Sequence, residues 1–151
     1  MKFKQITIVL SLFLLVAACK TNPFTGEKNL NFYPNSQIFP AAFQQYNQVL
    51  AESNVVTGTA EARMINRVGD KIATAAERFL NANGYAGYLD EYKWEYNLIK
   101  NDEQVNAWAM PGGKIAFYTG IMPIAQSEVG VAAIMAHEVA HALADHGAQR
   151  M

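Results

Sequence analysis

The sequence contains little that could crosslink a fold or attract a polyanion. Only one of its 151 residues is cysteine, so no disulfide can form within the chain. Twelve Lys and Arg residues stand against 13 Asp and Glu residues, which gives a net charge of −1. We expect no nucleic-acid partner, because such proteins carry an excess of positive charge. The 51% hydrophobic fraction instead indicates a packed core in a chain of about one domain's length.

Hydrophobic runs long enough to span a bilayer, which takes about 20 apolar residues, are also missing. The longest candidate, Ile6 to Val16, has eleven residues. It follows Lys2 and Lys4 and precedes two alanines, which is the pattern of a secretory signal peptide. We therefore expect residues 1–18 to be a signal peptide and the remainder to contain no membrane span.

The single cysteine lies directly after this segment. Val16 to Cys19 resembles a bacterial lipobox, in which the cysteine is lipidated and becomes the new N-terminus. Ordinary secretory cleavage after Ala18 is the alternative and would leave a free thiol. We expect lipidation of Cys19, with Lys20 favouring the outer membrane by resemblance to that pathway. Residues 19–38 are polar and rich in turn signals, so they predict a tether between the lipid in the membrane and the rest of the chain.

Two helices and a set of short strands are predicted in the next part of the chain. Apolar residues recur at helical spacing from about Pro40 to Ser53 and from about Thr59, a predicted cap, to Asn81. Alternation from Lys93 to Lys100 predicts a strand, followed by a turn at Asn101 and Asp102. Two more strands, with a tight connection at Pro111–Gly113, are expected at Val105–Met110 and Lys114–Thr119.

All three histidines lie close together near the C-terminal end. A helix capped by Ser127 and running to about His146 contains His137, Glu138 and His141 in the pattern His-Glu-x-x-His. At about 100° per residue, the two histidines of the pattern lie about 40° apart and one turn along the same face. This spacing suits two corners of a zinc tetrahedron, and the carboxylate between them can accept a proton from metal-bound water.

The alternative is that these histidines are ordinary polar residues on a helix surface. We favour the metal site, because the residues around them carry no charge, and a buried imidazole or carboxylate without a partner is costly. His146 lies on the opposite side of the helix from His137 and is not an expected ligand. Asp145 lies on the ligand side, where it is expected at most to orient His141. The uncharged neighbours are Met135, Val139, Ala140, Ala142 and Leu143.

The run from Asn106 to Met151 resembles metallopeptidase family 48, which includes HtpX-type membrane proteases and the CAAX prenyl proteases. The resemblance implies an α+β fold with a zincin-like gluzincin core: N-terminal helices, a small antiparallel sheet and the active-site helix. It implies one zinc ion per chain, bound by His137 and His141, with Glu138 as the catalytic general base. With the lipobox, it is most similar to the branch that is attached to the outer membrane, faces the periplasm and acts in envelope protein quality control.

In this family, an edge strand before the motif helix aligns extended substrate by backbone pairing. The resemblance makes the strand at Lys114–Thr119 the candidate, with Lys114, Ile115, Ala116 and Phe117 as its site residues. The alternative is an ordinary structural strand. The family's third zinc ligand is a Glu on a later helix, and residues 142–151 contain none. We therefore expect residues 39–151 to be the N-terminal part of a longer protease domain, with a natural short paralogue as the alternative.

The expected function follows from these observations. We expect a zinc-dependent metalloendopeptidase of the bacterial cell envelope that hydrolyses peptide bonds of misfolded envelope proteins by Glu-assisted attack of zinc-bound water. A catalytically inactive lipoprotein that acts as a chaperone or adaptor is the alternative. Both use polypeptide partners and a lipid anchor in the membrane.

Overall fold

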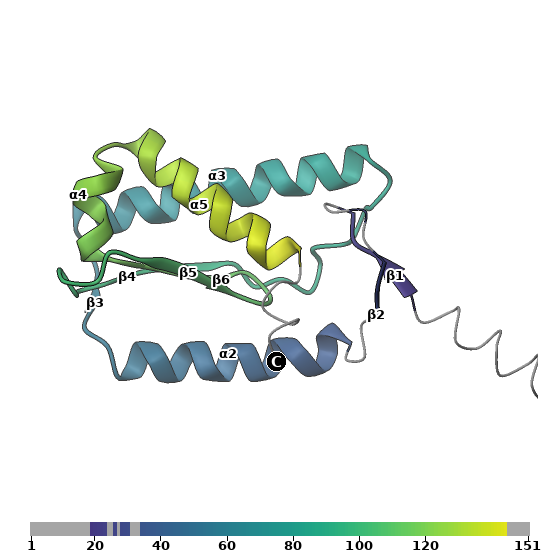
Figure 1. Ribbon diagram of the computed structural model, residues 1–151, viewed down its shortest axis with the longest axis horizontal. Helices are drawn as coiled ribbons and strands as arrows, with labels where there is room; N and C mark the ends of the chain where they lie inside the picture. Colours follow the sequence, from purple (N-terminus) through teal and green to yellow (C-terminus); the bar gives the residue numbers. More distant parts are fainter. Residues whose placement is uncertain (1–18, 24–25, 27, 31–33, 145–151) are drawn as a thin grey trace, which may run out of the picture. The chain divides into compact units, whose positions relative to one another are not determined.

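The computed structural model describes residues 19–23, 26, 28–30 and 34–144 (Figure 1). The chain divides into two compact units, residues 1–34 and 35–151. In the first unit, β1 (Cys19–Thr21) pairs antiparallel with β2 (Lys28–Leu30). The sequence predicted only a tether here. Its turn signals instead close a loop between two strands, with Gly26 N donating to Asn22 O at 2.9 Å.

Two long helices open the second unit. The helix α2 (Asn35–Ala51) begins earlier than predicted, because Pro40 lies inside it rather than at its first position. The helix α3 (Ala60–Ala82) matches the prediction to within one residue at each end. Thr59 caps it as expected, since its hydroxyl oxygen accepts a hydrogen bond from Ala62 N at 3.1 Å.

A four-stranded sheet has the order β3-β4-β6-β5. Its strands are β3 (Val55–Val56), β4 (Glu95–Ile99), β5 (Ala107–Met110) and β6 (Lys114–Tyr118). The outer strands β3 and β5 are antiparallel to their neighbours, but β4 and β6 are parallel. The sheet is therefore mixed, and the predicted antiparallel sheet is wrong in this respect. After β4 the chain leaves the neighbouring position empty and forms β5 one strand further out. It then turns back, and β6 fills the position between them, parallel to β4.

The turn between β5 and β6 explains two glycines. Gly112 and Gly113 both have positive φ angles, 79° and 87°, which glycine adopts without strain. A Cβ atom on Gly113 would lie 2.7 Å from the ring of Trp94, so the turn also packs directly against an aromatic side chain. The predicted tight connection at Pro111–Gly113 is confirmed.

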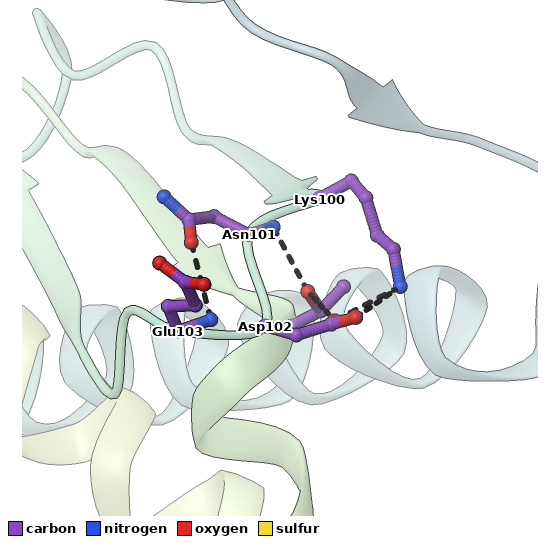
Figure 2. Close-up of polar contacts among 5 residues, drawn as sticks. Lys100, Asn101, Asp102 and Glu103 are labelled. Carbon is purple, nitrogen blue, oxygen red and sulfur yellow. Dashed lines mark hydrogen bonds and ion pairs between the residues drawn. The ribbon is translucent and has the colours of Figure 1, made fainter.

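The loop after β4 is fixed to the segment that follows β6 (Figure 2). Asn101 N donates to the Thr119 hydroxyl oxygen at 2.9 Å, and that hydroxyl donates to Asp102 at 2.6 Å. Lys100 forms an ion pair with the same carboxylate at 2.7 Å, and these contacts lower the pKa of Asp102. They hold the start of the short helices η1 (Thr119–Ile121) and α4 (Met122–Ala125), which the sequence did not predict.

Helices cover both faces of the sheet (Figure 1). The helix α2 lies on one face, and α3 and α5 (Glu128–Leu143) lie on the other. Tyr46, Ile99 and Ala116 form the core on the α2 face. Strand alternation turns Leu98, Ile115 and Phe117, all buried, toward α3 and α5. The last helix therefore rests on a closely packed apolar surface.

Among the described residues, no single helix is long and apolar enough to cross a membrane. Thr119–Ala125 and α5 meet that length and composition only when taken together, and they are bent by 120°.

Candidate metal centre and active site

The helix α5 carries the His-Glu-x-x-His pattern on its outward side. Ser127 caps the helix as predicted, since its hydroxyl oxygen accepts from Gly130 N at 3.2 Å. The residues that face inward are apolar and buried, and the helix contacts α3 and β5. His137 is exposed, while Glu138 and His141 are half-buried. The buried side consists of Val131, Met135, Val139, Ala142 and Leu143.

The two histidines converge as their spacing predicts. Their Nε2 atoms lie 3.0 Å apart, and their ring planes are inclined by 85° with centroids 4.4 Å apart. Two nitrogens bound to one tetrahedral zinc at the usual bond length lie about 3.3 Å from each other. His137 and His141 therefore fit two adjacent ligand positions. Within the part of the chain that the structure describes, no group of three or more His, Cys, Asp or Glu side chains gathers to complete a metal site.

Glu138 sits between the histidines in sequence and retains a proton more readily than an exposed glutamate. Its pKa is raised because burial disfavours the charged carboxylate, and the neighbouring His137 partly offsets this effect. A raised pKa makes the carboxylate a stronger base, which suits a group that takes up a proton during a reaction.

The start of α5 is tied to α3 by an interaction that sequence reasoning missed. Glu128 accepts hydrogen bonds from Arg67 at 2.7 Å and from Lys71 at 2.9 Å. These contacts lower the pKa of Glu128 to about 2. The carboxylate also lies at the positive end of the α5 dipole. The i, i+4 spacing of the two cations and the helix that they contact were both visible in the sequence, but the pairing of α3 with α5 was not.

The predicted substrate strand is not at an edge of the sheet. Lys114, Ile115, Ala116 and Phe117 lie in β6, which pairs with β4 on one side and β5 on the other. Their backbone hydrogen-bonding groups are already used, so the prediction that these residues pair with substrate is wrong. The strand that lies at the edge and contacts α5 is β5.

The side chain of Lys114 lies on the α2 face of the sheet, opposite α5, and makes structural contacts there. Its side chain is 9% exposed and forms an ion pair with Glu95 at 2.8 Å. The ammonium lies 4.9 Å from the ring centroid of Phe43 on α2. Lys114 thus joins the sheet to α2.

Four other predictions fall outside what the structure describes. Residues 1–18, Asp145 and His146 lie beyond the described ranges, and so does the side chain of Cys19. The lipidation of Cys19 stays a prediction.

Comparison with known proteins defines the class to which this site belongs. Residues 59–151, more than half of the chain, match peptidase family M48. The chain belongs to this family of metallopeptidases, as the sequence resemblance predicted.

Several relatives that match part of this chain are named as proteases. The chain is 41% identical over 63 residues to the mitochondrial metalloendopeptidase OMA1 of Schizosaccharomyces pombe, covering 42% of this chain and 18% of that protein. The Saccharomyces cerevisiae protein of the same name is 42% identical over 65 residues, covering 42% of this chain and 19% of the relative. A putative beta-barrel assembly-enhancing protease of Vibrio cholerae is 44% identical over 50 residues, covering 33% and 10%. The chain spans less than a fifth of the length of these relatives.

These relatives correct the predicted location. The OMA1 proteins of the two yeasts and of Arabidopsis thaliana are named as mitochondrial. The predicted place in a bacterial cell envelope, as an outer-membrane lipoprotein facing the periplasm, is therefore wrong on this comparison. The signal peptide at residues 1–18, which lies outside the described residues, stays a prediction.

Proposed function

We propose that this chain is part of a zinc-dependent metalloendopeptidase of the zincin-like gluzincin type. The observation that carries the proposal is the approach of the His137 and His141 Nε2 atoms to 3.0 Å beside the half-buried Glu138. Membership of family M48 supports the same reaction class. The substrates would be polypeptides.

The roles of the three residues follow from their chemistry. His137 and His141 would hold the ion through neutral imidazole nitrogens. Zinc, when bound, supplies Lewis acidity and brings the pKa of a bound water to about 7. Glu138 accepts the proton that the attacking water loses and donates it to the leaving amine nitrogen. The family resemblance implies a third ligand, a glutamate on a later helix.

We further propose β5 as the strand that aligns substrate. Tyr118 N donates to Asn106 O at 3.1 Å, so Asn106 faces β6 and so do Trp108 and Met110 by alternation. The backbone groups of Ala107 and Ala109 then face the outer edge. An extended substrate can add there as a further strand.

The test compares glutamates at two places. In a protein extended downstream to include the implied third ligand, we expect Glu138→Gln to keep its zinc content and to lose cleavage of casein by about 10²-fold or more, because the amide cannot accept the proton. The matched control is Glu91→Gln, at an exposed position outside the site, and it should cleave like the parent chain. His137→Ala should lower zinc content, measured by atomic absorption. Equal cleavage by Glu138→Gln and its parent would contradict the proposal.

A further inference from the structure

The sheet has a second accessible edge, on the side away from β5. The strand β3 has only two residues and covers Leu98 and Ile99 of β4. Among the described residues, no strand lies beside the first half of β4 on this side. Glu95 N donates to Gly113 O at 3.0 Å toward β6, and Lys100 N donates to Asn54 O at 2.8 Å on the β3 side. By alternation, the backbone N–H and C=O of Tyr96 face the uncovered edge.

A groove runs between this edge and α3. One part has a volume of about 840 Å³ and is lined by α3, the end of β3 and residues Glu95 to Leu98 of β4. A second part of about 430 Å³ reaches the start of β4 at Trp94. Asp70 and Tyr96 line both parts, so the two adjoin each other. The groove therefore follows β4 past the position where the strand lacks a neighbour.

The charge along the groove changes sign. Near β3 basic residues outnumber acidic ones, since Arg63, Arg67 and Lys71 line this part together with Asp70 and Glu95. Arg67 and Lys71 contact Glu128, but Arg63 donates to a carbonyl, Gly58 O, at 2.5 Å. Near the start of β4 it is lined by acidic side chains. These are Asp70, Glu77 and Asp90.

We propose that this groove binds an extended segment of a partner polypeptide as an added strand, antiparallel to β4 and in line with β3. The added strand would use the backbone groups of Tyr96, as an edge strand does in other peptide-binding sheets. Its first residues meet the basic end and its last residues meet the acidic end, so the segment carries an acidic residue early and a basic residue late. The site lies at the opposite edge of the sheet from β5 and needs no metal.

The probe is a labelled peptide, Glu-Thr-Val-Thr-Val-Thr-Lys, followed by fluorescence anisotropy with Glu138→Gln, so that the peptide is not cleaved. We expect saturable binding that Arg63→Glu weakens about tenfold. Arg78→Glu is the matched control, because Arg78 lies on α3 but does not line the groove. The charge-reversed peptide, Lys-Thr-Val-Thr-Val-Thr-Glu, should bind more weakly than the first and should regain affinity with Arg63→Glu.

Two further measurements keep the outcome clear. If Arg63→Glu fails to fold, Glu77→Lys at the other end of the groove takes its place in the test. This variant should weaken binding of the first peptide by a similar factor. In a ¹⁵N-correlated spectrum, the first peptide should shift the amides of Trp94 and Tyr96 and leave Ala107 and Ala109 in place. No saturable binding at about 1 mM, or shifts confined to β5, would overturn the proposal. Neither result depends on whether the chain hydrolyses peptide bonds.

Discussion

The two faces of the sheet are held by different interactions. On the α2 face, a polar network runs from Tyr46 through Asn97 and Glu95 to Lys114, with distances of 3.1, 2.9 and 2.8 Å. On the α3 and α5 face, the sheet packs against helices through apolar side chains and a helical glycine. There Tyr96 has the one buried side-chain polar atom that lacks a hydrogen-bond partner among the described residues. The first face therefore adds a hydrogen-bonded network to its apolar core, whereas the face that supports the histidines depends on close packing.

The largest effect should come from the packed face. A Cβ atom on Gly69 of α3 would lie 2.5 Å from the Tyr96 ring. We expect Gly69→Ala to lower the free energy of unfolding by about 1–3 kcal/mol, measured by urea denaturation. Helix propensity alone predicts the opposite sign, a gain of about 1 kcal/mol. A stabilised Gly69→Ala would show that this face is loosely packed.

On the hydrogen-bonded face, Tyr46→Phe should be the next largest change. The Tyr46 hydroxyl donates to Ile115 O at 2.7 Å and accepts from Asn97 at 3.1 Å. Burial raises its pKa, so the hydroxyl stays protonated and can donate throughout the ordinary pH range. Losing both bonds should lower the free energy of unfolding by about 1–2 kcal/mol. An unchanged unfolding midpoint would contradict the role given to the network.

The equivalent change on the other face should have little effect. Tyr96→Phe removes a buried hydroxyl that has no partner among the described residues, while the ring keeps its contact with Gly69. We expect the free energy of unfolding to rise or to stay within about 0.5 kcal/mol of the parent. Measured beside Tyr46→Phe, it compares the same chemical deletion on the two faces. If Tyr96→Phe lowered the free energy of unfolding as much as Tyr46→Phe, the proposed difference between the two faces would be contradicted.

The smallest effect should appear where α5 meets α3, at an exposed ion pair. Hydrogen bonds from Arg67 and Lys71 lower the pKa of Glu128 from 4.5 to about 2. Because the folded-state pKa is the lower one, the stabilisation is present above pH 4.5 and is lost as the pH falls toward 2. Thermal melts of Glu128→Gln should therefore differ from the parent at neutral pH and converge with it in acid. Added salt should also reduce the difference.

The sequence predicted those features that depend on near neighbours in the chain. The His137 and His141 geometry follows from a four-residue spacing on one helix, and the Thr59 and Ser127 caps follow from the residues beside them. The roles of the histidines as zinc ligands stay predictions.

Features that depend on distant segments were missed or predicted wrongly. Nothing in the sequence places β6 between β4 and β5, so Lys114 was assigned to an edge when it lies in the centre. The contact of Glu128 with Arg67 joins residues 61 positions apart. Strand order and helix pairing are set by how apolar faces match in three dimensions, which periodicity along one segment does not contain.

The central position of β6 also sets the order in which the molecule can be completed. It is the last strand of the four-stranded sheet to leave the ribosome, yet it is the only one that joins β4 to β5. Until it inserts, both of these strands present hydrogen-bonding edges that would accept any other extended chain. Tyr46 has no Ile115 carbonyl to bind and Glu95 has no Lys114 to neutralise it until that moment. The nascent chain is therefore most exposed to aggregation after β4 and β5 have emerged and before β6 follows them.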